Sequence, residues 1–221
     1  MVNRDTVESN LADKGFVLVE SVLSVAEVGR LCGETSLTAS GRAGLRQPHI
    51  SIPGIARLVE SAAIRNLVEP ILGPNAFIVR SILFDKTAES NWSVPWHQDL
   101  TVAVGERRDI PGFVGWSVKD GIHHAQAPRE VLEKMLTVRV HLDDCGLENG
   151  PLRVLPGTHK NGWLDSDAIH RFKNEIPEHI CVSDRGSALV MRPLLLHASS
   201  RATKPGHRRV LHLDLAAENA F

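Results

Sequence analysis

Apolar and polar residues alternate with a period of two in the second half of the chain. Segment 137–143 places valines and a leucine on one side and Arg139 on the other. Segment 208–216 repeats this pattern, with leucines opposite Arg208. A period of two predicts β-strands, and 77–85 (FIVRSILFD) is predicted as another strand. We expect the apolar sides to lie under helices and the polar sides to face a cavity.

Helical signals are concentrated in the first third of the chain. Ser24 and Glu27 form a capping-box pattern, which predicts a helix from about 24 to 36. A second helical segment is expected over 55–72, with an interruption near Pro70. The other predictions for this third are a polar lead-in, a short strand and a loop rich in Gly and Pro, at 1–14, 15–19 and 39–53.

Helices before residue 77 and short strands after it predict a mainly β protein with supporting helices. The arrangement suits a double-stranded β-helix, which is a jelly-roll barrel of the cupin type that begins at about residue 77. Its 221 residues suffice for one ordinary domain, expected to span 1–221. The remaining predictions are strands at 180–182, 187–191 and 194–198, a helix at 164–174 and a hairpin turn at Asn149-Gly150.

The longest irregular stretch runs from 100 to 136, although 101–104 is compatible with a strand and 128–135 with a short helix. Long loops inside compact domains usually serve function. We therefore predict a lid-like insertion over about 105–136. Its candidate substrate contacts are Trp116, Lys119 and His124.

Composition excludes several classes of partner. The net charge is −1, so there is no electrostatic case for binding nucleic acid or a membrane surface. No apolar run approaches the roughly 20 residues of a membrane span. The three cysteines, Cys32, Cys145 and Cys181, are scattered and show no metal-binding spacing. They are expected to be reduced thiols in a cytoplasmic protein.

The pattern His-x-Asp occurs three times, at 97–99, 141–143 and 212–214, and about one chance match is expected. Two of the three lie inside regular strand patterns, whereas His97 and Asp99 follow a loop and are predicted at a strand start, where a scaffold presents ligands. Side chains two apart on a strand share a face. With His197 as a third ligand, they form the two-histidine, one-carboxylate set of non-haem Fe(II) oxygenases.

Arg208 strengthens this interpretation. It lies eleven positions after His197 across a turn at 204–206, which predicts a hairpin that brings both to one site. A guanidinium can hold a carboxylate through two hydrogen bonds. Arg139 is expected to face the same cavity, where an anionic ligand or a partner such as Asp143 would offset its burial. Arg80 has two equally weighted interpretations, at a strand edge or inward near a ligand.

The chain resembles the phytanoyl-CoA dioxygenase-like Fe(II)/2-oxoglutarate oxygenases over about 15–216. The matching pieces are WHQD (96–99), NGPLRVLPGTHK (149–160) and LLLHASS with GHRRVLHLDLA (194–216). The resemblance implies a double-stranded β-helix, Fe(II) on His97, Asp99 and His197, and 2-oxoglutarate and O2 as cosubstrates. It also implies that Arg208 binds the distal carboxylate of 2-oxoglutarate.

The resemblance further implies cosubstrate contacts, which are Gln98, Ser199, Arg139 and Ile82. Relatives that halogenate replace the metal-binding carboxylate with a small residue, but Asp99 is present here, which favours hydroxylation of a small organic substrate. Two alternatives remain open: a zinc hydrolase on the same three ligands, and a non-catalytic binding protein on a cupin-like barrel. Neither of these has a need for Arg208.

Overall fold

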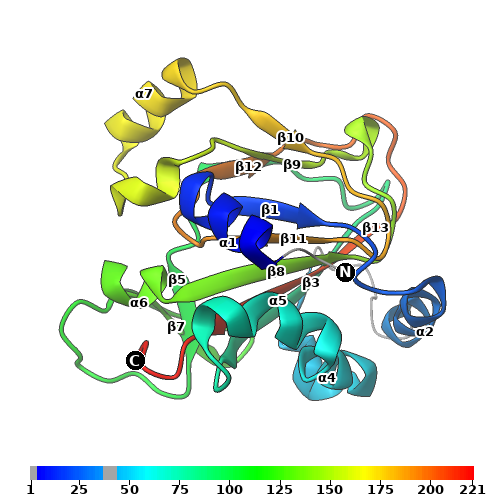
Figure 1. Cartoon of the computed structure of the whole chain (residues 1–221), viewed down its shortest axis with the longest axis horizontal. Coiled ribbons are helices and arrows are strands. Elements are labelled where there is room, and N and C mark those ends of the chain that lie inside the picture. Colours follow the sequence, from blue (N-terminus) through cyan, green and yellow to red (C-terminus); the bar gives the residue numbers. More distant parts are fainter. Residues whose placement is uncertain (1–3, 37–43) are drawn as a thin grey trace.

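The structure, a computed structural model, describes residues 4–36 and 44–221. Its largest sheet has six antiparallel strands in the order β1-β11-β8-β13-β3-β2. In that order the strands are Phe16–Val19, Ala188–Met191, Met135–His141, Arg208–Ala216, Phe77–Lys86 and Gly44–Arg46. Figure 1 shows this sheet at the centre of the molecule.

Two smaller sheets complete the β-structure. A four-stranded sheet has the order β10-β9-β12-β4, with strands His179–Cys181, Leu152–Val154, His197–Ser199 and Val94–His97. A three-stranded sheet has the order β5-β7-β6, with strands Thr101–Val104, Ile122–Gln126 and Val114–Lys119. Antiparallel sheets with supporting helices confirm the predicted fold class, a double-stranded β-helix.

The helices α1, α4 and α5 lie on one side of the six-stranded sheet (Figure 1). The α-helices α1 to α7 are Arg4–Asp13, Val25–Ser36, Pro48–Ser51, Pro53–Val59, Ala62–Leu72, Arg129–Glu133 and Ser166–Glu175, and two 3₁₀ turns are Leu147–Asn149 and Thr158–Asn161. None of the helices within 4–36 and 44–221 is long and apolar enough to cross a membrane.

The main hydrophobic core lies between these helices and the outer face of the six-stranded sheet. It contains the leucine stripe of β13 (Leu211, Leu213, Leu215) together with Ile55 and Ile64 from the helices. Burial of such side chains is the main force that holds helices on a sheet. The opposite face of β13 is thereby left to carry Arg208, His212 and Asp214, as the alternation predicted.

Several predicted elements are confirmed. The capping box begins α2, where the hydroxyl of Ser24 donates to Glu27 at 2.6 Å and the Glu27 amide donates back at 3.3 Å. Asp165 caps α7 by accepting from the amide of Ala168 at 2.8 Å. The strands expected at 15–19, 77–85, 101–104, 180–182 and 187–191 are present with small shifts in their ends.

The first third of the chain differs from the predicted elements in three places. Segment 1–14 was predicted as a polar lead-in, but its described part is helix α1, because Val7 and Leu11 bury one stripe. The second helical segment breaks at residues 60–61, and Pro70 lies within α5. The predicted loop at 39–53 contains β2 and α3 in its described part, and residues 39–43 lie outside the described residues.

Two predicted hairpins are absent from the sheets described. His197 is on β12 and Arg208 on β13, which belong to different sheets, so the turn between them is a crossover. Asn149-Gly150 likewise connects β8 to β9 in different sheets. Gly150 has a φ of 65°, and an added Cβ would clash with the carbonyl oxygen of Ser200. Its glycine is therefore required by a close backbone approach.

The stretch 100–136 was predicted as mostly irregular, which is wrong. It forms all of the three-stranded sheet, and β6 and β7 are joined by the two-residue turn Asp120-Gly121. Both turn residues have positive φ, 52° and 77°, as hairpin turns that match strand twist require.

Candidate metal centre

A cavity of about 250 Å³ lies where the six-stranded and four-stranded sheets face each other. Residues from both sheets and from the segments that flank β4 line it: Arg46, Arg80, Ile82, Phe84, Trp92, Val94, His97, Asp99, Arg139, Leu152, His197, Ser199, Arg208 and His212. The predicted ligands and most of the predicted cosubstrate contacts are therefore brought together.

Two histidines meet at this cavity because their strands pair. His97 ends β4 and lies directly opposite His197 on β12, with ring centroids 4.2 Å apart. The Nδ1 atoms lie 2.9 Å from the carbonyl oxygen of Pro95 and 2.8 Å from that of Leu195. A carbonyl only accepts, so each Nδ1 carries the proton and each Nε2 is free to bind a metal.

Asp99 completes the set. Its Oδ2 lies 3.5 Å from Nε2 of His197, and its Oδ1 lies 3.9 Å from Nε2 of His97. Oδ2 is buried without a hydrogen-bond partner, which is costly unless another group binds it. Burial alone would raise the pKa of Asp99, but His197, His212 and Arg80 hold it below its usual range.

The donor set fits a divalent transition metal. Ligand atoms of His97, Asp99 and His197 all lie within 4.8 Å of one another. Burial lowers the pKa of His197 to about 3, so its imidazole is neutral, as a metal ligand must be. Two imidazoles and one carboxylate with an open side match the ligand type of non-haem Fe(II) sites.

Two guanidinium groups face the same cavity and form no ion pair with a carboxylate of residues 4–36 and 44–221. Arg139 donates to Nδ1 of His212 at 2.8 Å, and Arg208 donates to the carbonyl of Gly150 at 2.7 Å. Within the part of the chain that the structure describes, the Nε atoms of both arginines are buried without a hydrogen-bond partner. Burial and repulsion from Arg208 lower the pKa of Arg139 to about 10. Such a pair fits an anionic ligand.

Asp143 was considered as a partner for these arginines, and the structure corrects this. The Asp143 carboxylate binds Arg209 through two side-chain hydrogen bonds, of 2.8 and 2.7 Å, on the other face of β13. Strand alternation therefore separates Arg208, inside the cavity, from its neighbour Arg209, outside it.

Arg80 and His212 belong to a buried network beside Asp99. Arg80 lies 2.6 Å from Asp214 and 3.5 Å from Asp99. His212 accepts from Arg139, so its Nε2 carries the proton and donates to Asp214 at 3.0 Å. Of the two interpretations of Arg80, the inward one is therefore correct. His212 was excluded as a metal ligand but predicted on the inward polar face of its strand, and it lines the cavity.

Ser199 lines the cavity with Ile82, and a buried lysine lies behind it. Lys86 donates to the hydroxyl oxygen of Ser199 at 3.3 Å and to the carbonyl of Ser200 at 2.6 Å. An ammonium group only donates, so the hydroxyl hydrogen of Ser199 is free to point at a ligand. Lys86 pairs with Arg208 across the strands, which places three donors together.

Gln98 occupies a different position from the one expected. Its amide nitrogen donates to the carbonyls of Gly162 and Leu194 at 2.8 and 2.7 Å, and its amide oxygen accepts from Leu164 at 2.8 Å. Gln98 does not line the cavity, because its side chain ties the strand that bears the ligands to two neighbouring loops.

The three substrate contacts predicted in the insertion do not line the cavity either. The side chain of Trp116 packs against Arg107, and Nδ1 of His124 bonds to the carbonyl of Ile122 at 2.9 Å, while Lys119 ends β6. These side chains are directed by the pairing within the three-stranded sheet.

The insertion instead reaches the cavity through its turn. Asp120 forms an ion pair of 2.9 Å with Arg46, which lines the cavity. Sequence reasoning assigned no role to Arg46, Asp120 or Lys86. Two signals were present: Asp-Gly between strand patterns marks a hairpin, and a lysine alternating with Ile82 and Phe84 shares their face.

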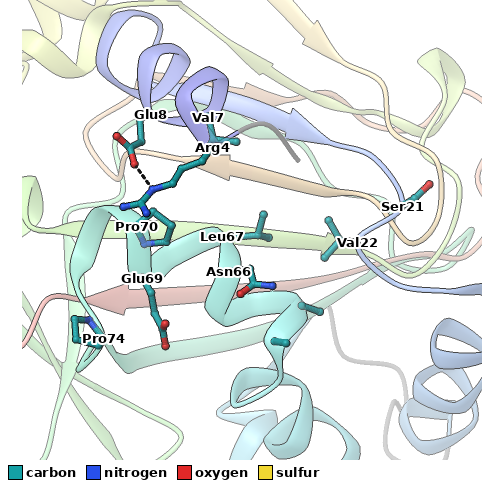
Figure 2. Close-up of a pocket in the computed structure, with 12 residues that line it drawn as sticks. Arg4, Val7, Glu8, Ser21, Val22, Asn66, Leu67, Glu69, Pro70 and Pro74 are labelled. Carbon is teal, nitrogen blue, oxygen red and sulfur yellow. Dashed lines mark hydrogen bonds and ion pairs between the residues drawn. The ribbon is translucent and has the colours of Figure 1, made fainter. Parts of the chain in front are cut away.

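A larger cavity, of about 720 Å³, lies near the helices α1 and α5 (Figure 2). The ion pair between Arg4 and Glu8 crosses its edge at 2.9 Å. Its lining contains neither histidine nor cysteine and shares no residue with the cavity of the metal ligands. The two cavities are therefore separate features.

The fold and the site define the class: a double-stranded β-helix in which two histidines and one carboxylate are placed to hold a metal ion. The model of the phytanoyl-CoA dioxygenase family matches residues 43–210, and the chain belongs to this family. The resemblance to this family that the sequence motifs indicated is thereby confirmed.

The sequence identity to individual relatives is low. The chain is 26% identical over 182 residues to L-proline trans-4-hydroxylase of Streptomyces griseoviridis, covering 71% of this chain and 60% of that protein. It is 27% identical over 176 residues to ectoine dioxygenase of Bordetella parapertussis, covering 72% and 50%. The chain thus spans about half to three fifths of these relatives. The crystal structure of EctD from S. alaskensis with bound Fe has a TM-score of 0.75 at 19% identity, covering 98% of this chain and 77% of that one.

Proposed function

We propose that this protein is an Fe(II)- and 2-oxoglutarate-dependent dioxygenase that hydroxylates a small organic substrate with release of succinate and CO2. One observation carries the proposal: the ligand triad and two buried guanidinium groups with unpartnered Nε atoms face one cavity. A metal explains the triad, and a dicarboxylate explains the arginines. The relatives include L-proline trans-4-hydroxylase and ectoine dioxygenase, whose names refer to small molecules.

The side chains then have distinct roles. His97, Asp99 and His197 hold the iron, which when bound supplies the oxidising power with O2. Arg208 and the hydroxyl of Ser199 hold the distal carboxylate of 2-oxoglutarate. Ile82 bounds the same cavity. Arg139 has a free Nε for the cosubstrate and keeps His212 in one tautomer.

The proposal is tested by succinate formation. The purified protein is incubated with Fe(II), 2-oxoglutarate, O2 and a panel of small molecules, and succinate is quantified with and without each component. A zinc hydrolase would cleave substrates with Zn(II) and form no succinate. A binding protein would retain the metal or a ligand and turn over neither. Succinate that forms without added iron or O2 would contradict the proposal.

Lys86 predicts a pH dependence of cosubstrate binding. Burial and repulsion from Arg208 lower its pKa to about 8; Cys145 acts in the other direction, and Arg139 adds a smaller repulsion. A bound dianion favours the protonated lysine, so affinity is highest below pH 8 and falls as the pH rises through 8. The expected loss between pH 7 and pH 9 is up to about tenfold, measured by anaerobic titration.

Lys86→Met supplies the control for that experiment. The variant lacks the titrating group, so its affinity for 2-oxoglutarate should be nearly constant over the same range and close to the high-pH value of the unmodified protein. A wild-type profile that is flat, or a steep profile that survives in Lys86→Met, would show that another group controls binding.

We also infer a cytoplasmic location. All three cysteines are free, and two of them, Cys145 and Cys181, are buried. Burial raises the pKa of Cys181 to about 12, so this thiol is unreactive at neutral pH. Unpaired thiols are typical of reducing compartments.

A further inference from the structure

The charges around the metal cavity point to the chemical class of the substrate. We propose that the substrate carries a negatively charged group, such as a carboxylate, and that Arg46 binds this group in place of Asp120. The inference rests on the proposed function, because the substrate is the molecule that enters beside a bound metal and 2-oxoglutarate.

Arg46 is directed into the cavity by strand pairing. It lies on β2, at the edge of the six-stranded sheet, directly opposite Ile82 on β3. Opposite residues in antiparallel strands project to the same face, and both residues line the cavity. The side chain of Arg46 is 35% exposed, so it lies at the mouth, where a substrate enters.

With a divalent metal and 2-oxoglutarate bound, the cavity would carry a net positive charge. Four guanidinium groups line the cavity, those of Arg46, Arg80, Arg139 and Arg208. They are balanced by three carboxylates: Asp99 in the lining, Asp214 on Arg80 and Asp120 on Arg46. A divalent metal and a dicarboxylate add equal and opposite charge. One positive charge therefore remains, to which Lys86 adds when protonated, and a monoanionic substrate would neutralise it.

Of these arginines, Arg46 is the one available to a substrate. Arg80 is held by both Asp99 and Asp214, and Arg139 and Arg208 are assigned to the cosubstrate end. Arg46 uses one nitrogen for its ion pair with Asp120, a residue whose side chain is 52% exposed. Exposed ion pairs contribute little stability, so an anion that enters the cavity can replace Asp120. The guanidinium can then bind it through two hydrogen bonds.

The test uses two variants that break the same ion pair. The Fe(II)- and 2-oxoglutarate-loaded protein is titrated anaerobically by calorimetry with propionate, 3-methylbutanoate and cyclohexanecarboxylate, and with the primary amide of each. At least one acid should bind at least tenfold more tightly than its amide. Arg46→Gln should lower the affinity for that acid by about tenfold to hundredfold. Asp120→Asn should raise the affinity for the same acid about twofold to fivefold.

Changes of acid affinity in opposite directions for the two variants distinguish recognition of the anion by Arg46 from a purely structural role of the ion pair. If the pair only fixes the hairpin, Arg46→Gln and Asp120→Asn will change acid and amide binding alike and in the same direction, which would overturn the inference. An absence of acid preference throughout the panel would also overturn it. Arg57→Gln is the control, because Arg57 forms a comparable exposed pair with Glu34 at 3.2 Å outside the cavity. The binding of 2-oxoglutarate is titrated before any acid or amide is added. A protein that does not bind 2-oxoglutarate would contradict the proposed function, and this result is distinct from a failure of the acid test.

Discussion

Replacing Asp99 with alanine is expected to abolish high-affinity Fe(II) binding and, with it, succinate formation. Asp99 supplies the carboxylate of the triad, and without it two neutral imidazoles remain to hold a divalent cation. Changes to residues that merely orient metal ligands cost about tenfold to hundredfold in affinity, so the loss of a ligand should exceed about a hundredfold. Anaerobic titration with Fe(II), or with Co(II) as a spectroscopic substitute, measures this directly.

His97→Ala and His197→Ala should behave in the same way, because each removes an Nε2 that faces Asp99. The matched control is His141→Ala, which removes a buried histidine of β8 that does not line the cavity. This variant should keep its metal even if it melts at a lower temperature. Metal retained at full affinity by Asp99→Ala, or lost from folded His141→Ala, would refute the assignment. His212 is a poorer control, since it lies 3.9 Å from Asp99.

The metal ligands could be predicted because local rules determine most of their placement. Residues two apart in extended chain share a side, so His97 and Asp99 were expected together. Their expected place at a strand start is corrected, because His97 ends β4 and Asp99 lies just beyond this strand. The sequence contains no comparable local rule for His197. Its position opposite His97 depends on pairing between strands about a hundred residues apart, which was supplied by a family resemblance and confirmed by the register of β4 and β12.

Arg208 lines the cavity as predicted, although the hairpin expected to place it there is absent. The turn at 204–206 signals a reversal of the chain, but turn chemistry does not state which sheet receives the next strand. The chain crosses from the four-stranded to the six-stranded sheet, and Arg208 still faces His197 because the two sheets enclose one cavity. Alternation along β13 was therefore the reliable signal, and it also placed Arg209 outside.

In the insertion at about 105–136, the sequence does not indicate which side chains face the cavity. Its substrate contacts were chosen for residue type, without a register, and side-chain direction in a strand depends on register. Once Asp120-Gly121 is recognised as the hairpin turn, β6 and β7 follow, and the turn places Asp120 beside Arg46 of the cavity lining. Lys86 was overlooked for a related reason: a single charge in an apolar strand gives no indication of its partners until Ser199 and Arg208 are placed beside it.

Replacing Arg208 with alanine is expected to weaken 2-oxoglutarate binding by roughly tenfold to a thousandfold or more. Arg208 is buried, its Nε has no partner, and it lies in the cavity with the metal ligands. Loss of a buried charge-assisted pair typically costs on the order of 2–5 kcal/mol, and about 1.4 kcal/mol corresponds to tenfold. Fe(II) affinity should survive, because Arg208 is not a ligand.

Arg209→Ala is the matched control for this last experiment, since the adjacent arginine binds Asp143 on the outer face of the strand. It removes the same charge one residue away and should leave the affinity for 2-oxoglutarate nearly unchanged. Arg208→Lys should fall between the alanine variant and the wild type, because an ammonium group keeps the charge but cannot form two parallel hydrogen bonds. Anaerobic titration of 2-oxoglutarate into the three Fe(II)-loaded variants provides the comparison. Equal affinities for wild type and Arg208→Ala would remove the main support for a dicarboxylate cosubstrate and favour a zinc hydrolase on the same ligands.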